Sequence, residues 1–478
     1  KFINLMNYKS ILFFLGIYSL LVSIFSILNI FYSIYFDFAI GLNSYLITFF
    51  ISLTIGLLFY YLGHSHSKNI SLPDQIIFIL LAFILIPSLI AIPYYYSIYD
   101  ISFLNSYFES ISGFTTTGFS IIDSVENIDE PLVLWRSSSQ WMGGLLFLLA
   151  TIGTIGSKQI KIKPAYLMSG GASGRNFYNN FNYNFFKITI IYFVSTVFVI
   201  FLYSSIGLRL LDSFNLAFTT ISSGGFLPND NLSNILKDEI QIFIFSISLL
   251  FPIFNFFLLY DVISRQFSFR KYQEDLHLAS LLILSVLILY FFIITNESFA
   301  NVFFAVVSSI STSGITTYSS NIDVSLFFIL LTIIGGSLIS TSSGLKYTRI
   351  YILLKISYQE IYRLVKPINI IDKNLYNSEA KIDDEDFKIA FLVFLLFIIS
   401  LFILSSILTL DYLTFEDSFK LSILTLTNTA SSALFGMGDL SFLDLNNFTK
   451  MSLILFMVFA KIELIALIYL IKKFIFKE

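Results

Sequence analysis

The chain has 478 residues, of which 56% are hydrophobic and 12% charged, and its mean hydropathy is +0.82. A soluble domain carries roughly 25% charged residues, so this composition excludes a soluble globular protein and indicates a polytopic membrane protein. The absence of cysteine excludes disulfides and thiolate chemistry, and a formal net charge of −3 offers no basic surface for nucleic acid. The three histidines do not cluster with acidic residues inside an apolar stretch, so we expect no enzyme active site.

Long apolar stretches predict about ten transmembrane helices and an all-α fold. In chain order they lie at about 11–36, 44–63, 75–98, 132–156, 186–208, 239–264, 277–295, 325–350, 388–409 and 448–474. The first two stand outside the pattern that the others follow, and we assign them to an N-terminal pair of helices in residues 1–70.

Four shorter apolar segments lie between the remaining spans, at about 103–115, 212–222, 299–311 and 415–428. Each is too short to cross a hydrocarbon core of about 30 Å, but it suits a helix that enters the membrane and turns back. The chain is therefore predicted to repeat one unit four times: a span, a short helix, a loop and a second span. We place these repeats at residues 71–165, 166–266, 267–366 and 367–478, around one pseudo-fourfold axis.

Each short helix runs into a loop of serine, threonine and glycine. The four loops align on an anchor position occupied by Gly118, Gly225, Gly314 and Ala430. Hydroxyl residues stand three positions before the anchor: Thr115, Ser222, Ser311 and Thr427. Aromatic residues stand eleven positions before it: Tyr107, Phe214, Phe303 and Phe419. A motif that recurs in register indicates four equivalent loops around one axis.

These loops contain the oxygens that a cation pathway needs. Irregular backbone at membrane depth must line water or be enclosed by protein, and glycine lets carbonyls turn toward an axis. A ring of neutral oxygens can then replace part of the hydration shell of an alkali cation. The candidate ion ligands are Thr115, Thr116, Thr117, Gly118, Ser222, Ser223, Gly224, Gly225, Ser311, Thr312, Ser313, Gly314, Thr427, Asn428, Thr429 and Ala430. We expect no organic cofactor in this chain.

The charges of the connecting loops predict the orientation. The loops that follow the four signatures are acidic or neutral, and the loops on the other side are basic. The basic residues are Lys158, Lys161, Lys163, Arg265, Arg270, Lys271, Lys346, Arg349, Lys355, Arg363, Lys366, Lys472, Lys473 and Lys477. By the positive-inside rule, the basic loops and both termini face the cytoplasm, and the signatures open outward.

The second span of the third repeat contains glycines and hydroxyl residues, which make poor helix. We expect a movable loop beneath the filter, formed by Gly335, Gly336, Thr341, Ser342, Ser343, Gly344 and Lys346. Lys461 lies deep in the last span, where a charge indicates function; its ammonium would be an electrostatic barrier in the pore. The alternatives are a static packing kink for the loop, and a structural pair of Lys461 with Glu463 or a backbone carbonyl.

Five carboxylates lie on or near the short helices. Four of them, close to helix starts, are expected to be N-terminal caps: Asp212, Glu297, Glu416 and Asp417. Glu109 comes too late in its helix to cap it. It would either tune the electric field of the filter or accept a hydrogen bond from a loop amide.

The motifs together resemble the Trk/Ktr/HKT superfamily of cation transporters. Thr115 to Gly118, preceded by Phe108 to Phe114, resembles the first filter of that family, and Ser222 to Phe226 resembles the second. Arg136 to Gly144 resembles the start of the span after the first filter, and Gly335 to Arg349 resembles the glycine-broken helix of the third repeat. The two extra N-terminal spans make the chain more similar to the TrkH-type branch than to the shorter KtrB-type.

This resemblance implies uptake of potassium, or sometimes sodium, across a bacterial cytoplasmic (inner) membrane, with K⁺ bound at the filter residues. It also implies a homodimer and a cytoplasmic nucleotide-binding regulatory subunit of the RCK/TrkA type. It supports the gate formed by the broken helix and Lys461.

Two positions depart from the family pattern. Ala430 stands where the family usually has glycine, and alanine disfavours a positive φ by roughly 1 kcal/mol or more. Lys461 stands where the family commonly has arginine, so the charge is kept without the planar guanidinium. A sodium-permeable or unselective pathway is therefore the main alternative to potassium uptake. An ion-coupled solute transporter is a further one, but it would need charged midplane residues in an inverted repeat.

Overall fold

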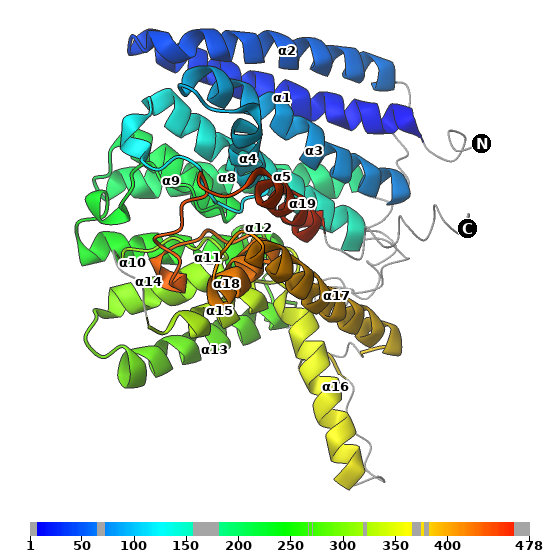
Figure 1. Cartoon of the computed structure of the whole chain (residues 1–478). Coiled ribbons are helices and arrows are strands. Elements are labelled where there is room, and N and C mark those ends of the chain that lie inside the picture. The colour runs from blue at the N-terminus through cyan, green and yellow to red at the C-terminus, as the bar shows by residue number, and fades with distance from the viewer. Residues whose placement is uncertain are drawn as a thin grey trace.

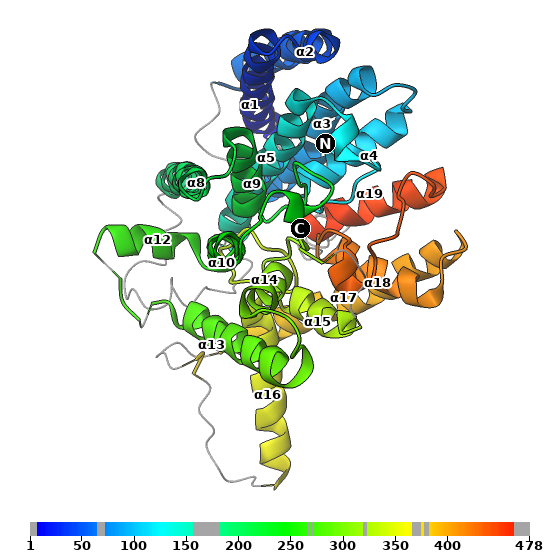
Figure 2. The ribbon, with the colours of Figure 1, turned by 90° about the vertical axis from the view of Figure 1, so that its left-hand side faces the viewer.

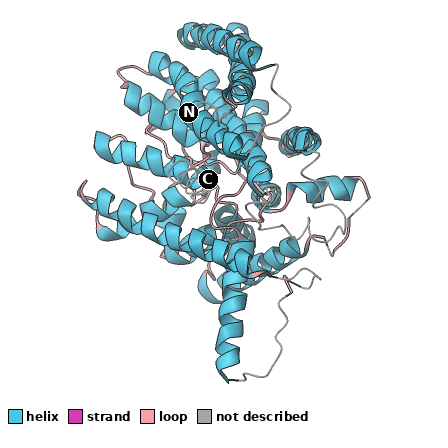
Figure 3. Ribbon diagram, turned by 90° about the vertical axis from the view of Figure 1, so that its right-hand side faces the viewer, coloured by secondary structure: helices cyan, strands magenta, loops and turns pink. Residues whose placement is uncertain are grey.

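The computed structural model describes residues 7–64, 72–155, 181–265, 267–269, 271–318, 323–365, 374–376 and 382–462. The long elements in these ranges are all helices (Figure 3). Six of the described helices are long and apolar enough to cross a membrane, or seven if one sharply bent pair is counted as a span. The prediction of an all-α polytopic membrane protein is therefore confirmed, while the number of ten spans stays a prediction.

The N-terminal pair consists of α1 (Tyr8–Tyr35) and α2 (Ala39–Gly63), which pack side by side along one edge of the molecule (Figure 1). A methyl group built on Gly16 would lie only 2.6 Å from the backbone nitrogen of Tyr60. The two helices therefore approach each other at backbone distance. The exposed side chains of α2 are mostly large and apolar, as expected for a surface in contact with lipid.

The rest of the chain forms four helix triplets, each with a short helix in the middle. They are α3 (Leu72–Ser97), α4 (Phe103–Phe114) and α5 (Glu130–Ile155); α8 (Phe181–Ser205), α9 (Leu210–Ser222) and α10 (Glu239–Ser248); α13 (Gln273–Ile288), α14 (Phe299–Ile310) and α15 (Ser325–Ile334); and α17 (Asp384–Thr409), α18 (Phe415–Leu426) and α19 (Asn447–Ile462). Figure 2 shows the triplets arranged around a common centre. The short helices match the predicted segments to within two residues at each end.

Each short helix also packs on the last helix of the preceding triplet. In this way α9 contacts α5, α14 contacts α10, α18 contacts α15, and α4 contacts α19. The contact of α4 with α19 joins the first triplet to the last. The four units therefore close into a ring, with the loops that follow the short helices directed into its centre.

One predicted span is broken. The stretch 239–264 was expected to be a single helix, but it consists of α10, α11 (Leu250–Ile253) and α12 (Phe256–Ile263), with a bend of 103°. Pro252 lacks an amide hydrogen and cannot continue a regular helix. Asn255 then caps α12, because its side chain accepts a hydrogen bond from the amide of Phe257 at 3.0 Å.

A second break separates α15, which ends at Ile334, from α16 (Tyr347–Val365), the helix that projects away from the bundle in Figure 1. The two broken segments are joined by backbone hydrogen bonds. The amide of Ser337 donates to the carbonyl of Ile253 at 2.9 Å, the amide of Ser342 to Pro252 at 3.1 Å, and the amide of Phe256 to Ile339 at 3.0 Å. Backbone groups that have left a helix inside the membrane are thereby satisfied.

The expectation that carboxylates cap the short helices is wrong. Side-chain hydroxyls cap three of them: Ser102, Ser298 and Thr414 accept from backbone amides three residues later, at 3.2, 3.3 and 3.1 Å. Asp212 instead pairs with Arg209, Glu416 with Lys420, Glu297 with the side chain of Asn301, and Asp417 with the hydroxyl of Thr414. These acids still lie near the positive ends of the helix dipoles, where negative charge is favourable.

Candidate functional site

The four loops share one unusual backbone conformation. Two positions before each anchor, a residue other than glycine has a positive φ: Thr116 at 55°, Ser223 at 61°, Thr312 at 60° and Asn428 at 46°. A residue with a side chain in this region costs about 1–3 kcal/mol, and the surrounding structure must impose it. Its recurrence at the same position in four loops means that the same turn is built four times.

The same hydrogen bond closes each of these turns. The amide one position before the anchor donates to the carbonyl six positions before the anchor. The pairs are Thr117 to Ser112 at 2.9 Å, Gly224 to Thr219 at 2.9 Å, Ser313 to Ser308 at 3.2 Å and Thr429 to Leu424 at 2.9 Å. The fourfold register predicted from the sequence is therefore present in the backbone.

The four anchors lie against one another at the centre of the ring. A methyl group built on Gly118 would lie 2.8 Å from Cα of Gly225 and 2.9 Å from Cβ of Ala430, and one built on Gly314 would lie 2.4 Å from the carbonyl oxygen of Ala430. The loop residues that carry hydroxyl groups are at most 1% exposed. All sixteen of the predicted ligand positions thus belong to loops that meet in one small, enclosed region.

Ala430 fits its loop without backbone strain. Gly118 and Gly314 have φ angles of 85° and 67°, but neither Gly225 nor Ala430 has a positive φ. Alanine therefore pays no conformational penalty at this anchor. Its effect is steric instead. The methyl group of Ala430 lies so close to Gly225 that a methyl group built on Gly225 would be only 2.3 Å from it.

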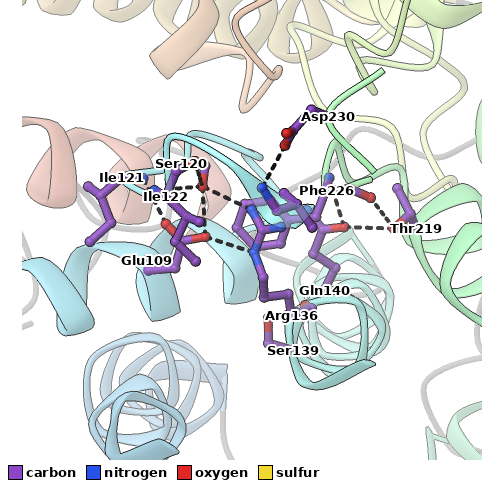
Figure 4. Close-up of polar contacts among 11 residues, drawn as sticks. Glu109, Ser120, Ile121, Ile122, Arg136, Ser139, Gln140, Thr219, Phe226 and Asp230 are labelled. Atoms are coloured by element: carbon purple, nitrogen blue, oxygen red, sulfur yellow. Dashed lines mark hydrogen bonds and ion pairs between the residues drawn. The ribbon is translucent and has the colours of Figure 1, made fainter. Parts of the chain in front are cut away.

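A buried ion pair supports the segment that follows the first loop (Figure 4). Nε of Arg136, on α5, donates to Oε1 of Glu109, on α4, at 3.0 Å, and both side chains are at most 3% exposed. Oε2 of Glu109 accepts from the amide of Ile121 at 2.9 Å, and Nη2 of Arg136 donates to Oγ of Ser120 at 2.9 Å. The bond to a loop amide, one of the two roles considered for Glu109, is present, and the other role, tuning the electric field of the filter, stays a prediction.

The helix α5 supports the second loop as well. The guanidinium of Arg136 lies 4.2 Å from the ring centroid of Phe226, a cation–π contact. Oε1 of Gln140 accepts from the amide of Phe226 at 3.3 Å, and the hydroxyl of Thr219 donates to the carbonyl of Phe226 at 2.8 Å (Figure 4). Our sequence reasoning singled out none of these contacts, although an arginine inside an apolar span is a signal that would have identified Arg136.

The predicted gate loop, residues 335–346, folds back on itself. Gly335 and Gly344 have φ angles of 64° and 80°, and a methyl group on Gly335 would lie 2.1 Å from the carbonyl oxygen of Ser343. Lys346 is 1% exposed, and its ammonium lies inside the loop. Nζ donates to the carbonyls of Ser337, Ser340 and Ser342 at 3.2, 3.2 and 2.5 Å, and to Oγ of Ser340 at 3.2 Å.

Two acidic residues at the start of α13 connect the gate loop to the other helix break. Oε1 of Glu274 accepts from the amide of Leu338 at 2.9 Å, and Oδ1 of Asp275 accepts from the amide of Asn255 at 2.9 Å. Both side chains are buried, at 3% and 5% exposed. The sequence analysis did not identify them, although a pair of acids at the beginning of an apolar span was a usable signal.

Lys461, on α19, joins the first of the four loops to the predicted gate loop. Its side chain is 1% exposed, and Nζ donates to Oγ1 of Thr116 at 2.6 Å and to Oγ of Ser343 at 2.8 Å. Nζ also lies 4.2 Å from the ring centroid of Phe147. The alternative partner considered for Lys461, Glu463, lies outside the described residues.

The fold and the four equivalent loops define the class of this protein: it is an all-α polytopic membrane protein with a central ring of re-entrant loops. No family profile matches the chain. It is 28% identical to an uncharacterised cation transporter of Methanocaldococcus jannaschii over 74% of this chain and 73% of that protein. It is 24% identical to the Trk system potassium uptake protein TrkH of Escherichia coli over 90% of this chain and 92% of that protein.

Among solved structures, the potassium transporter TrkH from Vibrio parahaemolyticus matches with a TM-score of 0.82. The match has 20% sequence identity and covers 97% of this chain and 98% of that one. The structural likeness establishes the fold, and the sequence relatives extend over most of the length of both proteins. Over most of its length the chain is therefore similar to TrkH-type potassium uptake proteins, and it shares the fold of a TrkH structure.

Proposed function

We propose that this protein takes up potassium ions through the ring of four loops. One observation carries the proposal: four loops in the same backbone conformation meet at one enclosed point, and residues 115–118, 222–225, 311–314 and 427–430 contain no charged side chain. Neutral carbonyl and hydroxyl oxygens are the ligands suited to a weakly bound alkali cation that must also leave. The potassium-uptake proteins among its relatives agree with this assignment.

In this proposal, K⁺ enters from outside, loses water among the sixteen filter residues and passes the gate loop and Lys461 toward the cytoplasm. The gate comprises Gly335, Gly336, Thr341, Ser342, Ser343, Gly344, Lys346 and Lys461. The ammonium of Lys461, bonded to both Thr116 and Ser343, lies where it would repel a cation leaving the filter. Opening the pathway therefore requires that Lys461 and the gate loop move apart from the filter.

We further propose the arrangement of the whole protein from the charges and the family. The four repeats are the units bounded at residues 71, 166, 267 and 367, and the basic loops and both termini face the cytoplasm of a bacterial cell. The chain works as a homodimer with a cytoplasmic nucleotide-binding regulatory subunit of the RCK/TrkA type. The driving force is the membrane potential, worth about 2.3 kcal/mol per charge per 100 mV.

The test is growth rescue of a bacterium that lacks potassium uptake, at low external K⁺, with uptake of ⁸⁶Rb⁺ and ²²Na⁺ followed in the same cells. We expect rescue and preferred uptake of Rb⁺. Gly314→Ala is expected to abolish uptake, because the added methyl would lie 2.4 Å from the carbonyl oxygen of Ala430. Gly207→Ala is its matched control, since Gly207 also has a positive φ, 86°, but has open space around it.

Uptake of Na⁺ without Rb⁺ would mean that sodium is the transported ion. The methyl group of Ala430 at the centre of the ring is the feature that motivates this alternative. Uptake of neither ion, with the protein in the membrane and a regulatory subunit co-expressed, would overturn the proposal.

A further inference from the structure

The gate loop and the filter loops are joined by hydrogen bonds. The hydroxyl of Thr341 donates to the carbonyl of Ile221, in the last turn of α9, at 2.8 Å. The amide of Ser343 donates to Oγ1 of Thr312, in the third filter loop, at 2.9 Å. The ammonium of Lys461 links Ser343 to Thr116 in the first loop. The gate loop and Lys461 thus contact the first and third filter loops and the end of the helix that leads into the second.

Thr312 has the central place in this network. It occupies the left-handed position of its loop, with φ of 60°, and it is 1% exposed. Its hydroxyl oxygen, which accepts from the Ser343 amide, lies 3.3 Å from Oγ of Ser223 in the second loop. Oγ of Ser223 in turn donates to the carbonyl of Ser311, the residue that precedes Thr312. One threonine hydroxyl therefore connects the gate loop to two filter loops.

The backbone strain at Thr312 makes its contact with Ser343 important for the shape of the loop. A β-branched residue leaves the left-handed region when the surrounding structure no longer holds it there. If the gate loop withdraws, Thr312 loses the amide that fixes its side chain, and the loop that carries it gains freedom. The size and number of oxygen positions in a filter decide between Na⁺ and K⁺, so a looser filter no longer favours the larger ion.

We infer that Thr312 is a positioning residue for ion selection: the Ser343 amide of the gate loop holds its hydroxyl, and this bond keeps the second and third filter loops in the shape that prefers the larger cation. The inference rests on the proposed function. It makes the gate a determinant of which ion passes, in addition to whether an ion passes. The coupling is reciprocal, so an ion bound in the filter also stabilises the closed gate loop.

The test compares Thr312→Val with Thr312→Ser. Valine keeps the β-branched shape and the same backbone strain but cannot accept the bond from Ser343, whereas serine keeps the hydroxyl. The measurement is the ratio of initial ⁸⁶Rb⁺ to ²²Na⁺ uptake at equal external concentrations. We expect the ratio to fall roughly 2- to 10-fold in Thr312→Val, the range expected for one lost hydrogen bond, and to stay at the wild-type value in Thr312→Ser.

Two further variants separate selection from gating. Ser343→Ala removes the acceptor for Lys461 but keeps the backbone amide, so we expect a changed uptake rate with an unchanged ion ratio. Thr341→Val removes the second bond from the gate loop to the filter and is expected to lower the ratio, which provides a test if Thr312→Val does not reach the membrane. A wild-type ratio in Thr312→Val overturns the inference, and if that variant does not reach the membrane, a wild-type ratio in Thr341→Val overturns it.

An equal change in the uptake of both ions in Thr312→Val also overturns the inference, because it would make Thr312 part of the gate alone. Failure of the proposed function is a different result: the wild-type protein itself would then take up neither ion.

Discussion

At the residue scale, Ala430 places a methyl group in a ring where the other three anchors carry only hydrogen. This methyl lies against Gly118 and Gly225. Under the proposed function it would narrow the space available to the ion. Because Ala430 does not have a positive φ, glycine is not needed there for conformational reasons. Because this φ angle suits any residue, exchanging alanine for glycine should have little effect on the backbone.

We predict that Ala430→Gly raises the initial rate of ⁸⁶Rb⁺ uptake and raises it more than that of ²²Na⁺. The expected gain is roughly 2- to 10-fold, which corresponds to a barrier lower by about 0.4–1.4 kcal/mol. Ala430→Val, which enlarges the side chain at the same position, is expected to reduce the uptake of both ions. Equal rates in the glycine variant and the wild type would show that the methyl does not lie on the ion pathway.

Glu109 is the only counter-charge within ion-pair distance of the buried Arg136 among the described residues. Glu109→Gln would leave the guanidinium buried with a neutral partner, and breaking such a pair costs about 3–5 kcal/mol. We therefore expect a large loss of thermal stability of the purified protein in detergent. It can be followed by the temperature at which the monodisperse peak disappears in size-exclusion chromatography.

The matched control is Glu360→Gln, which removes the same charge from the exposed pair with Arg363 on α16. An exposed pair contributes about 0–1 kcal/mol, so this variant should melt close to the wild type. If both variants melt at the same temperature, the Glu109–Arg136 pair does not stabilise the fold, and its role is limited to ordering the loop after the first filter segment.

At the element scale, α5 is the helix on which the first two filter loops rest, and its approach to the helix before the first loop is closest at Gly143. A methyl group on Gly143 would lie 1.7 Å from the carbonyl oxygen of Phe114, the last residue of α4. That oxygen belongs to backbone and cannot rotate away as a side chain would. Any larger residue must push α5 and α4 apart, and the first filter loop follows directly from α4.

We predict that Gly143→Ala abolishes Rb⁺ uptake while protein still reaches the membrane. Overpacking a tight contact usually costs about 1–3 kcal/mol of stability, and a large helical protein can still fold after such a loss. The first filter loop, however, would no longer keep its geometry. Gly207→Ala, a substitution in open space, should retain uptake. Normal uptake by Gly143→Ala would contradict the role of α5 as the support of the first loop.

The sequence predicted the short helices well and the helix breaks unevenly. The re-entrant helices were recognisable because the same spacing recurs four times, so each copy supports the others. The break at Gly335 to Gly344 was visible in its glycines. The break between α11 and α12 was missed because Pro252 and Asn255 lie inside one continuous apolar run. Hydropathy shows how long an apolar segment is, but it does not show whether the helix axis changes direction within it. The contacts of Arg136, Glu274 and Asp275 join residues far apart in the chain, and local pattern carries no information about such partners.

At the scale of the whole molecule, the four filter loops contain no group that can carry a proton, since their side chains are hydroxyls, one amide, one methyl and hydrogens. Three buried basic residues lie near these loops and are hydrogen-bonded: Lys346 to Ser342, Lys461 to Thr116 and Arg136 to Ser120. A coupled transporter needs a second ion site whose occupancy changes during the cycle. The ring of loops provides one continuous set of neutral oxygens, which suits passive conduction.

We therefore predict that the membrane potential alone limits how far the protein can concentrate Rb⁺. The purified protein is placed in vesicles that are loaded with K⁺ and diluted into low K⁺, so that the vesicle interior becomes negative. The ratio of internal to external ⁸⁶Rb⁺ should then reach about tenfold for every 60 mV, the equilibrium value for one positive charge. An added gradient of one pH unit or of Na⁺ should leave this limit unchanged. Raising external K⁺ to the internal concentration removes the potential and should abolish accumulation. If a pH or Na⁺ gradient raises the limit, then a coupling ion crosses with K⁺. The candidate carriers of that ion would then be Glu274 and Asp275, because these buried acids bind both helix breaks and sit where a protonation or an ion could move the gate loop.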